Sequence, residues 1–137
     1  MSIVLDASIA VASGFEDARS KIAQEIMATA IEEDMIVPSL WRLEVANALR
    51  TATRSKLCDD AFVDRSLGRL QAMSVTIDPE TDIHAWAETL RLSREEGLTL
   101  YDAAYLELAL RTGSRLASFD RQLVAAARRR GVDVLTV

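Results

Sequence analysis

Near its beginning the chain reads Ile3-Val4-Leu5-Asp6, three large apolar residues followed directly by an aspartate. Ile3 and Val4 are β-branched, and a short apolar run of this kind predicts a buried strand. The strand is expected to end at Asp6. The first carboxylate of the chain is therefore predicted to lie at the carboxyl end of a strand.

Four more short runs of this kind follow, at residues 35–37, 74–77, 115–117 and 132–135. Helical segments of ordinary globular length separate them, at residues 16–33, 40–53, 59–73, 80–96, 100–112 and 121–130. Gly97, Gly113 and Gly131 each follow a helical run, as left-handed C-caps do, and Pro38 and Pro79 precede helices. Strands that alternate with helices pair in parallel through right-handed crossovers. We expect an α/β fold with three α/β/α layers and a central parallel sheet of about five strands.

Length and composition predict one packed domain over residues 1–137. Half of the residues are hydrophobic and 27% are charged, a balance typical of a chain that buries a core. Cys58 is the only cysteine, so no intrachain disulfide is possible. The apolar N-terminus has no basic leader and is interrupted by Asp6, and no stretch is suited to spanning a membrane. We expect a cytoplasmic protein.

The residue types that are scarce limit the possible chemistry. One histidine and one cysteine cannot supply the nitrogen and sulfur ligands that zinc sites normally use. The five glycines are scattered and form neither a dinucleotide-binding fingerprint nor a phosphate-binding loop. Zinc and nucleotide cofactors are therefore not expected.

Four acidic residues are candidates for a functional site, because ligands in such folds bind beyond the carboxyl ends of the strands. Asp6 ends the first strand, and Asp120 follows the strand at 115–117 after a short step. Glu44 lies on the flank of an apolar helical stripe and is expected to point toward the sheet edge. Asp102 lies in the first turn of the helix at 100–112. We expect all four carboxylates to face one crevice.

Each of these acids also has a purely structural explanation. Asp6 and Asp120 are favoured N-cap residues for the helices that follow them. Thr99 and Asp102 have the spacing of a capping box, and the helix dipole stabilises an acid in the first turn. Glu44 gains little from its position unless it pairs with a neighbouring arginine, for which the candidates are Arg42, Arg50 and Arg54. Capping and metal binding are compatible, because a capping aspartate keeps a second oxygen free.

Four blocks of the sequence resemble PIN-domain proteins in their order and spacing. They are VLDAS at residues 4–8, PSLWRLEVANAL at 38–49, LTLYDAAYL at 98–106 and LASFD at 116–120. Ser118 is a departure, since the family more often has threonine there, but the hydroxyl is kept. The blocks run nearly end to end, and the pattern is most similar to the VapC-type toxins of type II toxin–antitoxin systems.

The resemblance implies a PIN-like fold and a small endoribonuclease that depends on Mg²⁺, for which Mn²⁺ can substitute. It implies that Asp6, Glu44, Asp102 and Asp120 form the catalytic metal site. Ser8, in the family's Asp-x-Ser start, and Ser118 are expected to support it, although N-capping explains Ser8 equally well. Converging carboxylates raise one another's pKa unless a cation neutralises them, and oxygen-only ligands suit Mg²⁺ or Mn²⁺.

Three partners are implied by the same resemblance: an RNA substrate, a cognate VapB-type antitoxin, and a second copy of the chain in a homodimer. The antitoxin groove is expected on the paired helices of residues 16–53. Their apolar side chains are equally well explained as core, and they include Ile22, Ile26, Ile31 and Leu43. Three aromatic residues are expected to pack in the interior rather than to stack on bases: Trp41, Tyr101 and Phe119.

The net charge of −5 is unusual for a protein that binds RNA. Its distribution is uneven, because residues 111–137 carry six arginines against Asp120 and Asp133, a net +4. Residues 42–56 carry four basic side chains against Glu44, a net +3. The two segments are expected to hold the RNA backbone on either side of the acids. A solvated helix face is the simpler explanation for Arg128, Arg129 and Arg130.

Two other functions are compatible with parts of this pattern. A phosphatase of the haloacid type needs a second aspartate two residues after the first, where this chain has Ser8. Activity on small phosphomonoesters but not on RNA would favour it. A non-catalytic PIN-like domain that serves as a binding module is the other alternative, and the presence of all four acids argues against it.

Overall fold

The computed structural model describes the whole chain, residues 1–137. Its strands are β1 (Ser2–Leu5), β2 (Asp34–Val37), β3 (Val75–Ile77), β4 (Arg115–Ala117) and β5 (Val134–Leu135). Its helices are α1 (Ala7–Ala12), α2 (Ala18–Glu32), α3 (Trp41–Arg54), α4 (Asp60–Gln71), α5 (Thr81–Ala85), α6 (Glu88–Glu96), α7 (Leu100–Thr112) and α8 (Arg121–Arg129). All five predicted strands are present, and the predicted helices lie close to their expected bounds, with one exception.

The strands form one parallel sheet in the order β3-β2-β1-β4-β5. In the central strand β1, Val4 pairs with Ile36 of β2 on one side and with Leu116 of β4 on the other. The chain builds β2 and β3 outward from β1 in one direction and then returns to build β4 and β5 in the other. Ligands of open parallel sheets bind at the carboxyl ends of the strands where the direction changes. Here that point lies between β1 and β4, the strands that lead to Asp6 and Asp120.

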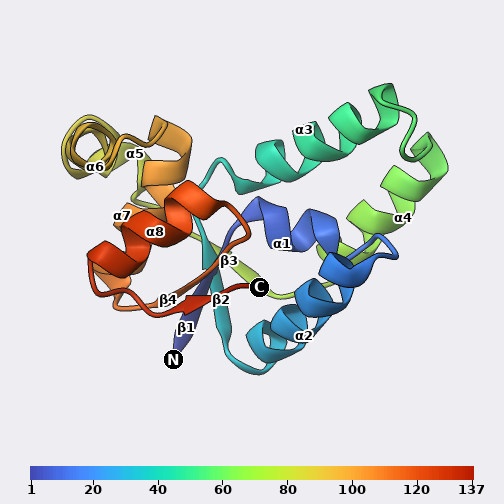
Figure 1. Ribbon diagram of the computed structural model, residues 1–137, viewed down its shortest axis with the longest axis horizontal. Helices are drawn as coiled ribbons and strands as arrows, with labels where there is room; N and C mark the ends of the chain where they lie inside the picture. Colours follow the sequence, from blue (N-terminus) through green and yellow to red (C-terminus); the bar gives the residue numbers. More distant parts are fainter.

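Helices cover both faces of the sheet, which confirms the predicted three-layer architecture. On one face α2 packs against β1 and β2, and on the other α7 packs against β1 and β4 and is covered by α6 and α8. Figure 1 shows these layers, with α3 and α4 extending together beyond the sheet. None of the eight helices is both long and apolar enough to cross a membrane.

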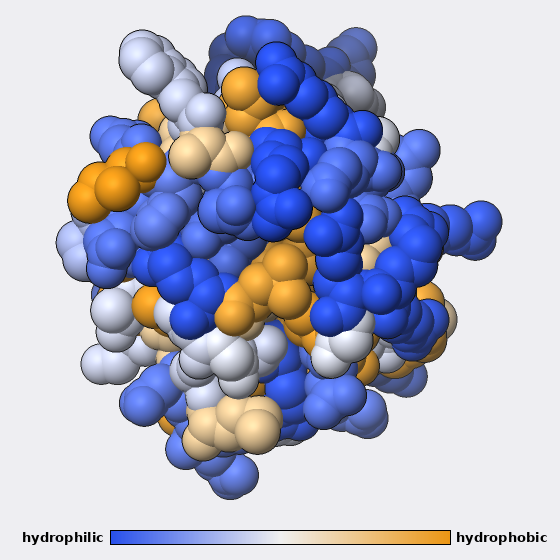
Figure 2. All heavy atoms as spheres, turned by 90° about the vertical axis from the view of Figure 1, so that its left-hand side faces the viewer, coloured by the Kyte–Doolittle hydropathy of each residue, from blue (hydrophilic) through white to orange (hydrophobic).

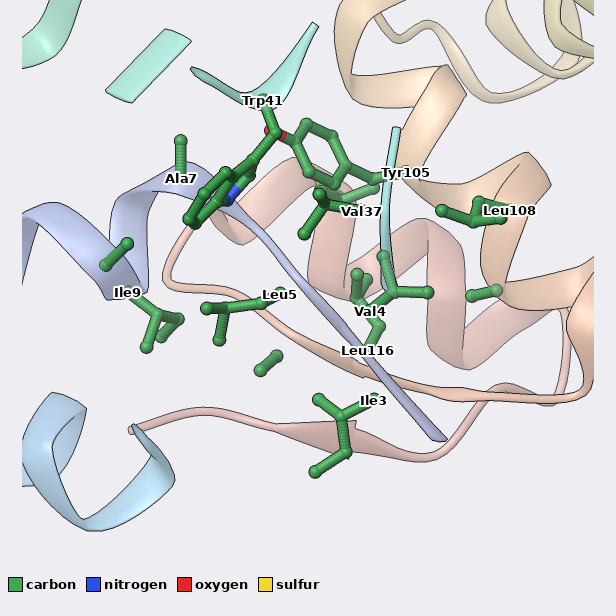
Figure 3. Close-up of a cluster of buried hydrophobic side chains, with 14 of the residues drawn as sticks. Ile3, Val4, Leu5, Ala7, Ile9, Val37, Trp41, Tyr105, Leu108 and Leu116 are labelled. Carbon is green, nitrogen blue, oxygen red and sulfur yellow. The ribbon is translucent and has the colours of Figure 1, made fainter. Parts of the chain in front are cut away.

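A cluster of 30 buried hydrophobic residues forms the core around β1. Ile3, Val4 and Leu5 are completely buried, as expected for a central strand with helices on both faces. In Figure 3, Trp41 and Tyr105 lie at the end of this core where β1 gives way to α1, and Ile3 lies at the opposite end. The carboxyl end of the sheet is thus backed by two large, immobile aromatic side chains.

The helix predicted over residues 80–96 is wrong, because the structure has two helices there. α5 ends at Ala85 and α6 begins at Glu88. Between them Ala87 has φ −117° and ψ −102°, which no helix allows, and the Trp86 side chain is 91% exposed. No glycine or proline marks this break. The chain turns there, and α6 packs along α7, the next helix of the chain; this tertiary packing overrides the continuous helix that the local sequence favours.

Two of the predicted helix ends depend on a glycine with positive φ. Gly97 ends α6 at φ 68° and Gly113 ends α7 at φ 64°, both in the left-handed region. The side of the molecule that carries α6 is largely hydrophilic, with only small, separate hydrophobic areas (Figure 2). Some of its charges are paired, since Arg129 and Arg130 of α8 both bind Glu96 of α6.

Candidate active site

Asp6 lies where β1 ends and α1 begins, and only 6% of its surface is exposed. Its backbone N–H donates to the Ala117 carbonyl of β4 (2.9 Å), so the residue continues the strand ladder. Its Oδ2 accepts hydrogen bonds from the hydroxyls of Ser8 (2.8 Å) and Ser118 (2.6 Å). The expected side-chain cap of α1 is not formed, because this carboxylate is turned toward the two hydroxyls instead.

The two serines tie the ends of β1 and β4 together. Ser118 Oγ accepts a hydrogen bond from the Asp120 backbone N–H (3.0 Å) while it donates to Asp6. Ser8 Oγ accepts from the Phe119 backbone N–H (3.1 Å) while it also donates to Asp6. Each hydroxyl is therefore oriented by the segment that leads to Asp120, and both lie against the same carboxylate.

Asp120 caps α8, as the sequence predicted. Its Oδ1 accepts a hydrogen bond from the Leu123 backbone N–H (3.0 Å). No protein group donates a hydrogen bond to its other oxygen. The capping role therefore fixes the direction of the carboxylate and leaves one oxygen for a ligand.

Asp102 lies in the first turn of α7 and is half-buried. Thr99 Oγ1 caps this helix by accepting from the Asp102 backbone N–H (3.1 Å). The return bond of a capping box, from the Asp102 side chain to the Thr99 N–H, is not formed, so only half of the predicted box is present. Apart from a weak hydrogen bond with the Thr99 hydroxyl, the Asp102 carboxylate has no hydrogen-bond partner in the protein.

Glu44 is held by a tyrosine rather than by the arginine that we expected. The Tyr105 hydroxyl on α7 donates to Glu44 Oε1 on α3 (2.6 Å), and no arginine pairs with this carboxylate. Tyr105 is completely buried, and desolvation raises its pKa far above the usual range, so its hydroxyl stays protonated and remains a donor. The sequence analysis missed Tyr105. Its position three residues after Asp102, on the same face of a helix, was the available signal.

Electrostatics shows that these acids lie close to one another. Burial raises the pKa of Asp6, and the nearby charge of Asp120 raises it further. Burial also raises the pKa of Glu44, with a smaller contribution from Asp6. The pKa of Asp102 is raised to about 6, first by desolvation and then by the charges of Asp120, Asp6 and Glu44. The structure thus brings all four predicted acids within electrostatic reach, at the carboxyl edge of the sheet.

A second group of buried acids provides a contrast. Asp78 and Glu107 are as deeply buried as Asp6, but Arg111 donates to both, at 2.6 Å to Asp78 Oδ2 and 2.8 Å to Glu107 Oε2. None of the four acids at the sheet edge forms a salt bridge. Their only side-chain donors are neutral hydroxyls. Buried acids are normally neutralised, so the sheet edge has an unmet requirement for positive charge.

The donor set at the sheet edge fits a hard divalent cation. All of its donors are carboxylate and hydroxyl oxygens. Mg²⁺ and Mn²⁺ prefer such oxygen ligands, whereas zinc sites normally use softer nitrogen and sulfur ligands. No three Asp, Glu, His or Cys side chains lie close enough together to form a complete ligand set in the present conformation. An ion would therefore be held partly by water, as Mg²⁺ usually is, or by inward rotation of the half-buried carboxylates.

The two predicted basic segments differ, because residues 111–137 are mostly neutralised within the fold whereas the basic side chains of residues 42–56 form no salt bridge. Four of the six arginines in residues 111–137 form salt bridges with acids of other elements: Arg111, Arg115, Arg129 and Arg130. In that segment only Arg121 and Arg128 form no salt bridge, so the positive charge predicted there is largely neutralised. Tyr101 was also predicted to pack, but it is 63% exposed, whereas Trp41 and Phe119 are buried as expected.

The α3–α4 pair carries an apolar groove of about 240 Å³, lined by Trp41, Val45, Leu67 and Leu70 among others. The Trp41 indole N–H is buried there without a hydrogen-bond partner. Two of the side chains proposed for the antitoxin groove belong to the core instead, because Ile26 is 7% exposed and Ile22 packs against the buried cluster. Ile31 and Leu43 are exposed and face solvent.

The chain is similar in sequence to a known family and to two of its members. The PIN domain family profile matches residues 3–129. Ribonuclease VapC3 of Pyrobaculum aerophilum is 32% identical over 127 residues, which cover 90% of this chain and 92% of that protein. Exonuclease VapC9 of the same organism is 35% identical over 106 residues, which cover 77% of this chain and 75% of that protein.

Solved structures share the fold. PAE2754 from Pyrobaculum aerophilum superposes with a TM-score of 0.71 at 29% identity, covering 98% of this chain and 84% of that one. VapC20 of Mycobacterium tuberculosis, described as a toxin that cleaves the sarcin–ricin loop, gives a TM-score of 0.67 at 21% identity over 91% of this chain and 95% of that one. At that identity the second likeness concerns the fold alone.

Proposed function

Because this chain belongs to the PIN-domain family, we propose that it is the toxin of a type II toxin–antitoxin system, an endoribonuclease that depends on Mg²⁺ or Mn²⁺. The two relatives described above bear the names Ribonuclease VapC3 and Exonuclease VapC9, which supports hydrolysis of phosphodiester bonds. The structural observation that carries the proposal is the group of acids without cations at the carboxyl edge of the sheet. We further propose that the 137 residues act as one domain, in the cytoplasm.

Asp6, Glu44, Asp102 and Asp120 are the proposed ligands of the metal. When bound, the ion supplies positive charge and Lewis acidity at the scissile phosphodiester and lowers the pKa of a nucleophilic water. Ser8 and Ser118 hold Asp6 Oδ2 in place, and Tyr105 holds Glu44 Oε1, so that the remaining oxygen of each carboxylate can face the ion. The hydroxyls do this without adding charge, which preserves the attraction for a cation.

Asp102 has a distinct proposed role in proton transfer. Its pKa of about 6 lies closer to neutrality than that of an ordinary aspartate, and a weak hydrogen bond with the Thr99 hydroxyl is the only one that its carboxylate receives. A group with such a pKa can accept a proton from an attacking water and release it again near pH 7. Binding of a cation would lower this pKa and favour the ionised, accepting form.

A cognate VapB-type antitoxin is the proposed protein partner, and homodimerisation is proposed from the family. The structure of a complex named VapBC2, from Rickettsia felis, has the same fold at 12% identity and a TM-score of 0.64, covering 100% of this chain and 99% of that one. The groove between α3 and α4 is the proposed antitoxin site, because its lining is mostly apolar and an apolar partner segment would cover it. Ala46→Asp, at an exposed position that lines the groove, should weaken the complex without unfolding the toxin.

The test is cleavage of structured and single-stranded RNAs by the purified protein in Mg²⁺, Mn²⁺ or EDTA. Asp6→Asn and Asp102→Asn should each abolish metal-dependent cleavage while the circular dichroism spectrum stays native. Asp60→Asn is the matched control, since Asp60 is an exposed acid in the first turn of α4. A wild-type protein that cleaves no RNA and binds no Mn²⁺ would indicate a binding module, and one that hydrolyses only small phosphomonoesters would indicate a phosphatase.

A further inference from the structure

A depression of about 290 Å³ lies between α2 and α8, next to the candidate active site. Three arginines line it: Arg19 near the start of α2, and Arg121 and Arg128 on α8. Figure 1 shows the C-terminus of the chain between these two helices, where Thr136 and Val137 complete the lining. Residues far apart in the sequence thus form one basic concavity, which we call the arginine groove.

The three arginines of this groove share one concavity and none of them has an acidic partner. The salt bridges of the chain involve Arg91, Arg111, Arg115, Arg129 and Arg130, and none involves Arg19, Arg121 or Arg128. An arginine in the first turn of a helix, such as Arg121, is also unfavourable to the helix dipole. The groove therefore concentrates positive charge at some expense of stability, in a protein whose net charge is −5.

Arg19 is fixed in position by the segment that leads to the active site. Its Nη2 donates to the Phe119 carbonyl (3.3 Å), and its guanidinium carbon lies 4.7 Å from the centre of the Phe119 ring. The remaining N–H groups of that guanidinium have no partner in the protein. An arginine held in this way loses little conformational entropy when it binds an anion.

Phe119 forms the wall between the arginine groove and the acids. Its ring lines the groove, whereas its backbone N–H donates to Ser8 Oγ, which in turn donates to Asp6. Asp120, the next residue, caps the helix whose first residue is Arg121. The basic and acidic sites are thus adjacent, and they share one rigid segment.

We propose that the arginine groove binds the phosphodiester backbone of the RNA strand next to the bond that the acids and their metal cleave. This inference rests on the proposed function and adds to it a phosphate subsite. Arginine presents a planar fork of N–H donors that matches a phosphate group. From Arg121 to Arg128 the helix rises about 10 Å, the length of about three stacked nucleotides. The subsite therefore contacts the backbone of more than one nucleotide and contributes affinity without reading the bases.

The test compares Arg121→Gln/Arg128→Gln with Arg65→Gln/Arg94→Gln, which removes two exposed arginines that also lack salt bridges and lie outside both predicted basic segments. Binding of a short fluorescein-labelled single-stranded RNA is measured by anisotropy in EDTA over a series of KCl concentrations. The groove variant should bind roughly tenfold more weakly near physiological salt, and its plot of log K against log[salt] should be shallower by about 1.4. In Mg²⁺ its KM for cleavage should rise while kcat stays unchanged.

Two further comparisons keep the outcome decisive. Arg121→Lys/Arg128→Lys keeps both charges and should keep the wild-type salt dependence; a loss as large as that of the glutamine variant would overturn the electrostatic assignment. Equal RNA affinities for the groove variant and its control, or weakened binding of polyglutamate but not of RNA, would also overturn the proposal. A wild-type protein that binds RNA through the groove and fails to cleave it would refute the proposed nuclease function and leave the groove intact.

Discussion

Replacing Asp102 by asparagine should stabilise the metal-free protein while it removes a proposed metal ligand. The substitution keeps the shape of the side chain, and the helix cap survives because it uses the Asp102 backbone N–H. What changes is charge. The pKa of Asp102 rises from 3.8 to about 6 on folding, because the site desolvates it and three other carboxylates surround it. The folded state therefore resists ionisation of Asp102 more than the unfolded state does, and the neutral amide removes that penalty.

The size of the effect follows from the same pKa. A rise from 3.8 to about 6 corresponds to about 3 kcal/mol at 1.36 kcal/mol per pKa unit. Asp102 is only half-buried, so solvent screening reduces this to about 1.5 kcal/mol, and loss of the favourable helix-dipole interaction leaves about 1 kcal/mol. For a chain of 137 residues this is an increase in Tm of about 3 °C.

The stabilisation expected for Asp102→Asn depends on pH. Asp102 has a raised folded-state pKa, so its penalty is absent below about pH 4, grows as pH rises toward 6, and is constant above that. Asp102→Asn should therefore be more stable than the wild type at pH 7.5 and gain about half as much at pH 5. Thermal unfolding in EDTA measures this. Added Mn²⁺ should raise the Tm of the wild type much more than that of the variant.

The matched control is Asp60→Asn, which removes an exposed acid from the first turn of α4. It should lower stability slightly through the helix dipole at both pH values and leave the response to Mn²⁺ unchanged. If Asp102→Asn also lowered the Tm of the metal-free protein, or changed it equally at pH 5 and 7.5, the reasoning about uncompensated carboxylates would be refuted.

Three other substitutions test the contacts around the site. Tyr105→Phe removes only the hydroxyl that holds Glu44, and it should reduce kcat/KM for RNA about tenfold and weaken Mn²⁺ binding measured by calorimetry. Tyr101→Phe, at an exposed tyrosine on the same helix, should change neither quantity. Ser118→Ala leaves the Asp6 carboxylate and the Asp120 N–H without a shared partner and should lower the free energy of unfolding by about 2 kcal/mol in urea titrations; an unchanged midpoint would contradict the described link between β1 and β4. Arg111→Met leaves two buried acids unpaired and should destabilise by about 3 to 5 kcal/mol, in contrast to Arg94→Met, whose arginine is exposed and forms no salt bridge.

The sequence predicted the parts of the site that depend on local structure. Asp6 follows a run of apolar residues that only a central strand buries completely, and Asp120 stands where an N-cap is needed. Asp102 was placed by the helix that it begins. Because parallel strands bring their carboxyl ends to one edge, locating these elements was enough to bring the acids together.

Contacts between distant segments could not be predicted in the same way. Tyr105 and Glu44 are 61 residues apart, and Arg19 and Phe119 are 100 residues apart, so no local pattern links them. The expected arginine partners of Glu44 lie on its own helix, where spacing can be counted, whereas the real partner comes from α7. The charge of residues 111–137 was overestimated for the same reason, since Arg111 and Arg115 are neutralised by acids that only the tertiary fold brings near.

The arrangement of charge distinguishes structural from functional ionisable groups. Where an acid secures the fold, as Asp78 does, an arginine neutralises it. At the carboxyl edge of the sheet the acids are left with neutral donors, and on the other side of Phe119 the arginines are left without acids. These opposite charges would gain stability by pairing, and the rigid Phe119–Asp120 segment keeps them separate. A metal ion and a phosphodiester strand, bound together, would satisfy both sites at once. The separation of charge therefore favours a metal ion at the acids together with an anionic ligand at the arginines, and an RNA strand bound beside a metal centre meets both requirements.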